Sequence, residues 1–406
     1  MSFFASVCLL LACAHALGWL AERCGQPALL GHMLAGIMVG PSILKWLPPG
    51  PALAAIADIS VLFVVISAGL EMRMQHVVDT LRGKGAVALA LSFLIPAAAT
   101  ATFTYVLGMD FVPAIVVVLC ISVTALPVAL RFLSEFQLLN TRVARIAISS
   151  ALLTDIVVLL TLGIAIAVSR QQDAGESIFA TGGIAMAKLA LLLAVVGGCY
   201  FVCSKVSAQA RSLVIPRREV VVDGVLITVI VSMFLLGVVS EQLGFHFVIG
   251  VFIASLLVTR ELVGDARFRN LEYGFEVTTV SIFGPLFLAY QGVQFEVGAL
   301  EDAVLVFGLI LIAVVSKLIG GYAAARLNVL PHYEACGVAI IMNARGVMEM
   351  VVASIAYRAG LVSQELFSTL LIVGIVTTVI TPSMLKYWLK DEKKMKAMLS
   401  AGETGA

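Results

Sequence analysis

Charged side chains are scarce in this sequence. Lys, Arg, Asp and Glu supply 13% of its 406 residues, whereas 61% of the residues are hydrophobic and the mean hydropathy is +1.07. Soluble globular domains are about 25% charged, so the composition excludes a soluble globule and indicates a polytopic membrane protein. The formal net charge of +1 gives no electrostatic basis for a nucleic-acid partner.

Cysteine pairs with metal-ligand spacing are also missing. The seven cysteines include no C-x-x-C pair and most lie in apolar runs, so we predict seven small buried residues without disulfides. Cys199 and Cys203 share a helix face, but without a neighbouring His or third Cys they make a poor metal site. No nucleophile, base and orienting group occur together. The sequence therefore predicts neither a cofactor nor an enzyme.

Two targeting or regulatory signals are absent as well. No G-x-G-x-x-G motif occurs, which argues against an attached nucleotide-binding regulatory domain, although a separate regulatory subunit stays open. No Lys or Arg precedes the first apolar run, so we interpret that run as a retained helix and not as a signal peptide. The lysine-rich end, residues 391–406, is predicted to be a short cytoplasmic tail that meets anionic lipid or solvent.

Apolar runs long enough to cross a bilayer fill most of the chain. A transmembrane helix needs about 20 such residues. The runs occupy residues 3–20, 26–44, 55–71, 85–107, 111–130, 141–168, 181–203, 220–240, 244–259, 275–292, 301–325, 333–357 and 364–388. We therefore predict an all-α polytopic membrane protein with about 13 transmembrane helices.

Lys and Arg alternate between rich and poor loops, which predicts the orientation of the chain. One set of alternate loops is rich in these residues and includes the C-terminal lysines, whereas the opposite set holds Lys45, Arg170 and Arg358. The asymmetry places the amino terminus outside and the carboxyl terminus in the cytoplasm.

Two sequence matches suggest an internal repeat. His32 to Gly36 matches His246 to Gly250, 214 positions later, and Thr124 to Val128 matches Asn343 to Val347, 219 positions later. The members of each pair lie seven predicted helices apart, so the copies enter the membrane from opposite sides. Inverted repeats of this kind are typical of secondary transporters. We predict a transmembrane domain over 1–390, with repeats at roughly 1–168 and 220–390 and a linker helix at 181–203.

One acid, Asp155, lies near the middle of the apolar run 141–168 and is preceded by Thr154. A carboxylate at mid-membrane costs about 2.5–3.5 kcal/mol on insertion scales, so such a residue normally faces a water-filled cavity or a cation. The alternative is an Asp that only pairs with a neighbouring helix, a role that a hydroxyl or an amide would fill at lower cost. The working hypothesis is that Asp155 binds a proton and a competing ion.

Helix breakers occupy equivalent places in the second repeat match. Pro127 removes a backbone donor and Gly346 loosens the turn, both at mid-membrane. Discontinuous helices at matching places of two repeats point to a transport site, because their half-helix ends carry partial charges and free carbonyls. The alternative is a proline kink in an ordinary packed helix.

These residues together resemble the cation:proton antiporter superfamily, in particular the branch of plant cation/proton exchangers and bacterial antiporters of Na⁺ or K⁺. The resemblance covers nearly the whole chain and is carried by five segments: Gly36 to Pro41 (GIMVGP), Gly69 to Glu71 (GLE), Ser122 to Val128 (SVTALPV), Thr154–Asp155, and Met342 to Glu349 (MNARGVME). It implies inverted repeats with two crossing discontinuous helices, and a homodimer with a core domain and a separate dimerisation domain in each subunit.

The resemblance also implies roles for particular residues. Asp155 matches the ion- and proton-binding aspartate. Thr154 takes the preceding place, which is Asp in electrogenic members and commonly Asn in exchangers like this one. A neutral residue there favours electroneutral exchange, although Thr departs from the common pattern and leaves the stoichiometry open. Thr124 and Val123 would offer a hydroxyl and a carbonyl, and Asn343 an amide.

Three further charges lie in apolar runs. Lys317 is in a place where the family pairs a lysine with an acid that this sequence lacks, so we expect it to pair with Asp155 or with Glu349. Arg345 and Glu349 lie four residues apart and are spaced to pair on one helix. All three charges also fit a network that only fixes the crossing helices, and the sequence does not separate these interpretations.

The function predicted from these features is exchange of Na⁺ or K⁺ for H⁺ across a bacterial inner membrane. Cation and proton would compete for Asp155, with elevator-like alternating access and no cofactor. Two rival interpretations stay open: a sodium-coupled symporter of an organic anion, which can share this fold, and a membrane sensor that binds an ion without transporting it.

Overall fold

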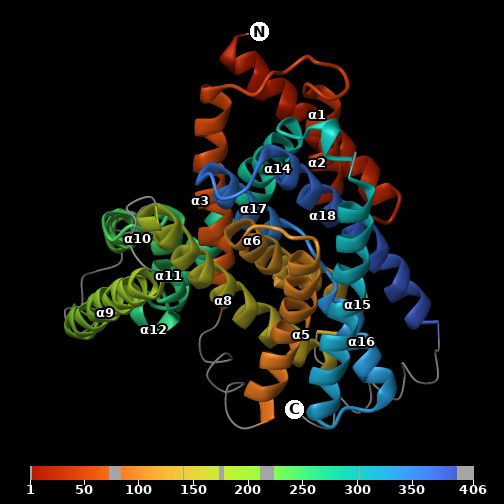
Figure 1. Cartoon of the computed structure of the whole chain (residues 1–406). Helices are drawn as coiled ribbons and strands as arrows, with labels where there is room; N and C mark the ends of the chain where they lie inside the picture. Colours follow the sequence, from red (N-terminus) through yellow and green to blue (C-terminus); the bar gives the residue numbers. More distant parts are fainter. Residues whose placement is uncertain are drawn as a thin grey trace. The chain divides into compact units, whose positions relative to one another are not determined.

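The structure of the protein is a computed structural model that describes residues 2–72, 84–139, 141–172, 178–210, 224–300 and 302–390. Within these residues every regular element is a helix and no strand occurs (Figure 1). The all-α prediction is therefore confirmed for the described part of the chain. The predicted tail, 391–406, lies outside it.

The helices follow the predicted apolar runs closely. Their bounds are α1 Phe3–Arg23, α2 Ala28–Val39, α3 Pro51–Glu71, α5 Lys84–Val106, α6 Phe111–Ser122, α7 Leu126–Glu135, α8 Arg142–Gln172, α9 Ile178–Ala210, α10 Gly224–Gln242, α11 Phe247–Leu256, α12 Arg260–Val263, α13 Asp265–Thr278, the π-helical turn η1 Thr279–Phe283, α14 Gly284–Val293, the 3₁₀ turn η2 Val297–Leu300, α15 Ala303–Leu327, α16 His332–Met342, α17 Val347–Arg358 and α18 Gln364–Trp388.

Two boundaries differ from the prediction for clear reasons. The predicted run 26–44 ends as a helix at Val39, because Gly40 and Pro41 stop it. The predicted run 275–292 is preceded by ten helical residues, since α13 begins at Asp265. The first turns of α13 are rich in charged side chains, so hydropathy alone gives no signal there.

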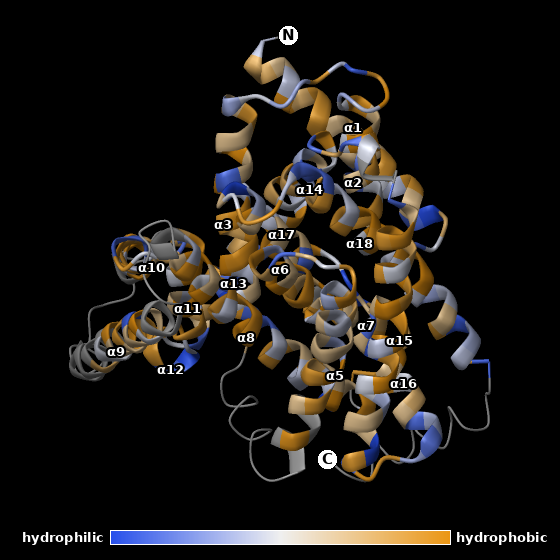
Figure 2. Cartoon of the chain, in the orientation of Figure 1, coloured by the Kyte–Doolittle hydropathy of each residue, from blue (hydrophilic) through white to orange (hydrophobic). Residues whose placement is uncertain are grey.

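Six described stretches are long and apolar enough to cross a membrane. They are Phe3–Arg23, Pro51–Glu71, Arg142–Ser169, Ala303–Leu327, His332–Arg358 and Gln364–Trp388, and shorter apolar helices accompany them. Figure 2 shows apolar residues along most helices and hydrophilic ones mainly at helix ends and in loops. These features confirm an integral membrane protein. Cys8 and Cys24 lie exposed on the surface, so the prediction that all seven cysteines are buried is wrong.

The chain packs as two compact units. The first draws on Met1–Asp58, Gln75–Leu162 and Pro285–Ala406, and the second on Ile59–Met74 and Gly163–Gly284. In the first unit α15 packs against α5 and α16 (Figure 1). A buried apolar cluster that includes Val128, Phe132, Ile341 and Trp388 supports α7 and α16. Every candidate site residue falls in this first unit.

Helix bounds recur along the chain at one spacing. The helix starts Ala28 of α2 and Phe247 of α11 are 219 positions apart, as are Lys84 of α5 and Ala303 of α15. Gly25 and Gly244, at the same separation, both have positive φ, 71° and 93°, in the turns after α1 and α10.

The sequence match between His32 and His246 is therefore five residues out of register. His32 lies inside α2, whereas His246 is the N-cap of α11. At the spacing of the helix bounds, Gly31 corresponds to Gly250. Both glycines allow backbone contact with the preceding helix, because an added Cβ would lie 2.1 Å from the Leu17 carbonyl oxygen and 2.4 Å from that of Leu236, respectively.

Candidate ion-binding site

Two helices of the first unit are interrupted at their centres. Residues 123–125 separate α6 from α7, and residues 343–346 separate α16 from α17. The two breaks bond to each other: the Ala125 amide donates to the Ala344 carbonyl oxygen at 3.0 Å, and the Thr124 hydroxyl donates to the Met342 carbonyl oxygen at 3.3 Å. The predicted pair of crossing discontinuous helices is confirmed.

Pro127 and Gly346 act differently from one another. Pro127 lies in the first turn of α7, where a helix needs no backbone donor, so it helps the helix to restart after the break. Gly346 is extended, and a Cβ there would lie 3.0 Å from a Val128 methyl carbon and 3.5 Å from the Ala125 Cβ. Glycine at 346 therefore allows the two broken helices to approach closely, whereas the sequence had predicted that it loosens the turn.

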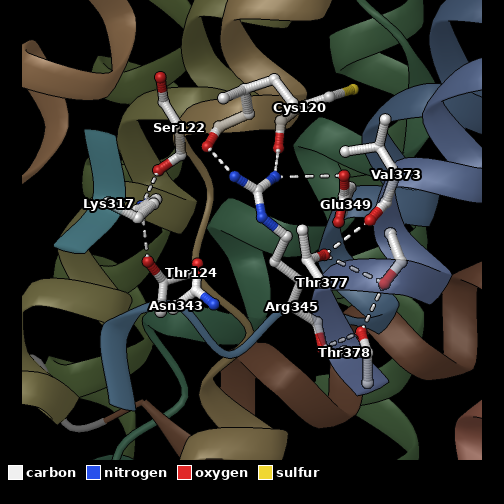
Figure 3. Close-up of polar contacts among 12 residues, drawn as sticks. Cys120, Ser122, Thr124, Lys317, Asn343, Arg345, Glu349, Val373, Thr377 and Thr378 are labelled. Carbon is white, nitrogen blue, oxygen red and sulfur yellow. Dashed lines mark hydrogen bonds and ion pairs between the residues drawn. The ribbon is translucent and has the colours of Figure 1, made fainter. Parts of the chain in front are cut away.

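Arg345 bridges the breaks with a fully buried guanidinium. Its Nη1 donates to the Cys120 carbonyl oxygen at 2.9 Å, and its Nη2 to that of Ile121 at 2.6 Å (Figure 3). Nη1 also lies 3.2 Å from the Glu349 carboxylate, so the pair expected from the four-residue spacing forms. The cation therefore caps the negative carboxyl end of α6, while Glu349 lies in the first turn of α17, where the helix dipole favours an anion.

Lys317 reaches the first break from α15, and its side chain is fully buried. Its ammonium donates to the Ser122 carbonyl oxygen and, at 2.7 Å, to the Thr124 hydroxyl (Figure 3). Among the ion pairs of the described residues, none joins Lys317 to Asp155 or Glu349, so its direct partners differ from those expected.

Asp155 lies inside α8 with 1% of its surface exposed. Within the described part of the chain neither carboxylate oxygen has a hydrogen-bond partner. A buried carboxylate without partners is costly unless a proton or a cation neutralises it. The alternative considered above, an Asp that only pairs with a neighbouring helix, therefore has no hydrogen bond to support it among the described residues.

The neighbouring residue Thr154 turns its hydroxyl back to its own helix. Its Oγ1 lies 2.5 Å from the Ser150 carbonyl oxygen and 3.0 Å from that of Ala151. The hydroxyl proton is used there, which leaves Oγ1 free only to accept. Val123, the C-cap of α6, is extended and 1% exposed.

Helix α18 contributes threonine hydroxyls to the second break, and these were not predicted from the sequence. The Thr378 hydroxyl lies 3.3 Å from the Arg345 main-chain carbonyl oxygen. The Thr381 hydroxyl lies 3.3 Å from the Asn343 main-chain carbonyl oxygen and 3.2 Å from Nδ2 of the Asn343 side chain. Threonines at 377, 378 and 381 within an otherwise apolar run are the signal that would have pointed to this face.

The candidate site therefore draws on the two breaks and on helices α15, α17 and α18. Thr124, Asn343, Arg345, Glu349 and Lys317 are connected by direct hydrogen bonds or through the joined breaks. Asp155, on α8, is buried but has no hydrogen bond to this set among the described residues. Among the described residues no cluster of three or more His, Cys, Asp or Glu has metal-binding geometry.

A membrane-embedded helical fold with two broken helices crossing near a buried carboxylate defines a secondary transporter, and not an enzyme. The chain belongs to the sodium/hydrogen exchanger family, since the transmembrane model of that family matches residues 9–391. The predicted superfamily is thereby confirmed.

Individual relatives match nearly the whole chain. It is 26% identical to the Na⁺/H⁺-K⁺ antiporter GerN of Bacillus cereus, over 97% of this chain and 98% of that protein. It is 25% identical to an Na⁺/H⁺ antiporter of Enterococcus hirae, over 96% and 99%. Cation/H⁺ antiporter 15 of Arabidopsis thaliana is 27% identical over 88% of this chain, which spans 44% of that protein.

A solved structure shares the fold. The sodium proton antiporter MjNhaP1 of Methanocaldococcus jannaschii, at pH 8, superposes with a TM-score of 0.70 and covers 95% of this chain and 96% of its own. The sequence identity is 15%, so this likeness concerns the fold alone.

Proposed function

We propose that this protein exchanges a monovalent cation, Na⁺ or K⁺, for H⁺, with both ions competing for Asp155. The observation that supports this most is the carboxylate itself, which is 1% exposed and has no hydrogen-bond partner among the described residues. The names of the relatives from Bacillus cereus and Enterococcus hirae point to the same exchange.

Competition at one carboxylate is sufficient for obligatory exchange. Asp155 carrying either a proton or a cation is neutral, and the neutral form can pass the apolar barrier between the two sides of the membrane. The bare carboxylate is too costly to move, so an empty carrier stalls. We propose that the access change is an elevator-like movement of a core domain that includes both breaks, within a homodimer.

The buried charges favour electroneutral, one-for-one exchange. Glu349 already pairs with Arg345, so Asp155 is the carboxylate that stays available for an ion. Thr154 is neutral and its hydroxyl proton is engaged within α8. One available carboxylate takes one proton or one monovalent cation, and either leaves the same net charge on the site.

The candidate ligands are hard oxygen atoms, which suit Na⁺ or K⁺. Besides Asp155, we propose the Thr124 hydroxyl, the Val123 carbonyl, the Asn343 amide oxygen and Thr154. Lys317 would balance the charge of Asp155 when no ion is bound. In the orientation predicted from Lys and Arg, the chain sits in a bacterial inner membrane with its carboxyl terminus in the cytoplasm.

Transport by the purified protein tests the proposal. Liposomes containing the protein and a pH-sensitive dye receive a proton gradient, and Na⁺ or K⁺ is then added in turn. We expect cation-dependent proton movement in the wild-type protein and none in the Asp155→Asn variant. If exchange is electroneutral, the rate of Na⁺/H⁺ exchange should not change when valinomycin and K⁺ set the membrane potential. Proton movement that survives Asp155→Asn would exclude Asp155 as the carrier.

The rival functions give different results in the same assay. An ion-coupled symporter shows no cation-dependent proton movement and instead accumulates an organic anion when Na⁺ is supplied. A sensor binds the cation, detected as a shift in thermal unfolding, without moving either ion.

A further inference from the structure

We propose that Thr381, on α18, is a positioning residue that holds the Asn343 amide with its nitrogen towards α18, so that the amide oxygen is the atom offered to the transported cation. The inference deepens the proposed function and depends on it. It rests on the hydrogen bonds around Thr381, on the burial of both residues and on one free oxygen.

The first step concerns the hydroxyl proton of Thr381. Oγ1 lies 2.9 Å from the Thr377 carbonyl oxygen, one turn earlier on α18, and 3.3 Å from the Asn343 carbonyl oxygen. Carbonyl oxygens only accept hydrogen bonds, and a hydroxyl has a single proton. Thr381 is fully buried, so water does not compete. The proton is therefore donated to one of these two carbonyls.

The second step concerns the side-chain amide of Asn343. Its Nδ2 lies 3.2 Å from Thr381 Oγ1. Because the hydroxyl proton is already donated, Oγ1 can only accept from the amide, and the amide nitrogen is the group that donates. The flipped amide would either set two acceptors against each other or take the hydroxyl proton away from the nearer Thr377 carbonyl oxygen, 2.9 Å from Oγ1. The bonding pattern thus selects one of the two amide orientations.

The third step concerns the side-chain oxygen of Asn343, which has no hydrogen-bond partner in this orientation. Asn343 is fully buried, and its Oδ1 has no hydrogen-bond partner within the described residues. A buried acceptor without a partner keeps the cost of losing its hydration. A bound cation would offset that cost, since amide oxygens are ligands that hard cations accept.

The position of Asn343 fits this role. It is the first residue of the second break, between Met342 and Ala344, whose carbonyl oxygens bond the first break. The hydroxyl of Thr124, which bonds Met342, also contacts Lys317. Asn343 thus lies where the two breaks meet, on the same polar network as Lys317.

The test compares Thr381→Val, which removes the hydroxyl, with Thr381→Ser, which keeps it. Thr369→Val is the matched control, because within the described residues the hydroxyl of this buried threonine of α18 bonds the Glu365 carbonyl oxygen of its own helix and no group of another helix. In the liposome assay we expect Thr381→Val to raise the KM for the cation about tenfold with little change in the maximal rate, as for loss of a bond to a charged ligand. Thr381→Ser and Thr369→Val should stay near wild type.

Asn343→Ala provides the second arm. If Thr381 acts through Asn343, the double variant Thr381→Val/Asn343→Ala should have the KM of Asn343→Ala alone. A purely structural role predicts instead that the two effects on KM multiply and that the maximal rate falls. Where Thr381→Val does not fold, Thr381→Ala replaces it. The rise in unfolding temperature on adding the cation also measures cation binding without a transport assay.

The outcomes separate this inference from the proposed function. If wild-type protein shows no exchange, or if Asp155→Asn still exchanges, the proposed function is wrong and this inference is wrong with it. If both behave as proposed but Thr381→Val shifts KM no more than Thr369→Val, or Thr381→Ser does not restore it, only the role of Thr381 is overturned.

Discussion

Arg345 and Glu349 form a fully buried ion pair, with 3.2 Å between guanidinium Nη1 and carboxylate Oε1 and with both side chains 0% exposed. The same guanidinium donates to two carbonyl oxygens at the end of α6. The pair therefore connects the carboxyl end of one half-helix with the amino end of another, and it stabilises the crossing on which the proposed ion site depends.

Breaking this pair should be costly for stability. Arg345→Met leaves Glu349 as an unpaired buried charge and frees the Cys120 and Ile121 carbonyls, so we expect a loss of about 3–5 kcal/mol in the free energy of unfolding. Thermal unfolding in detergent, followed by loss of monodisperse protein, measures the effect. The double variant Arg345→Met/Glu349→Leu should recover part of the loss, because no charge is then left alone. Equal instability of the single and double variants would contradict the pairing argument.

The exchange rate should show direct competition between protons and cations. A proton on Asp155 blocks the cation, so lowering the pH by one unit should raise the KM for the cation up to about tenfold where protonation limits binding, by mass action. The maximal rate at saturating cation should change much less. Initial rates over a range of cation concentrations at several pH values measure this. A KM that is independent of pH would show that the two ions use separate sites.

Removing the charge of Lys317 should strengthen cation binding. Lys317 contacts Thr124, a ligand of the proposed site, and its positive charge would repel an incoming cation, so Lys317→Gln should lower the KM several-fold while keeping a donor near Thr124. We also expect reduced thermal stability, since the Ser122 carbonyl at the end of α6 loses a charged partner. Lys317→Arg, which keeps the charge, is the control. A higher KM in Lys317→Gln than in wild type would mean that Lys317 assists cation binding.

A methyl group at Gly346 should be poorly tolerated. Gly346→Ala would place a carbon 3.0 Å from a Val128 methyl carbon and 3.3 Å from a Leu29 methyl carbon, so these side chains must shift slightly, at a cost of about 1–3 kcal/mol. Gly197→Ala in α9 is the matched control: an added Cβ there has no neighbour within 4 Å, and Ala in a helix gains about 0.5–1 kcal/mol. Thermal unfolding of the two variants compares them. Similar stabilities would show that the crossing can relax around the added group.

The features that local sequence determines were predictable. Apolar runs predicted nearly all of the helices, and Pro127 and Gly346 marked both breaks, although Gly346 is explained by its close neighbours Val128 and Ala125 and not by a loose turn. The Arg345–Glu349 pair followed from helical spacing. The start of α13 did not follow, since Asp265 opens a stretch too polar for the hydropathy signal.

Contacts between distant residues were not predictable in this way. Lys317 contacts Thr124, 193 positions away, and Asn343 contacts Thr381, 38 positions away. No periodicity within one helix encodes such neighbours. The sequence match between His32 and His246 also gave a register that differs from that of the helix bounds. The glycines Gly25 and Gly244 have the register of the helix bounds, but their shared positive φ is visible only in the structure.

The hydrogen bond from Ala125 to Ala344 has an evolutionary consequence. It joins the two breaks through main-chain atoms, so apart from proline at 125 no amino-acid replacement removes its donor or its acceptor. The neighbouring ligand candidates, Thr124 and Asn343, are side chains and can be exchanged. Single substitutions at Thr124 or Asn343 can therefore change the proposed ion ligands, while the donor and acceptor of this main-chain bond between the breaks persist.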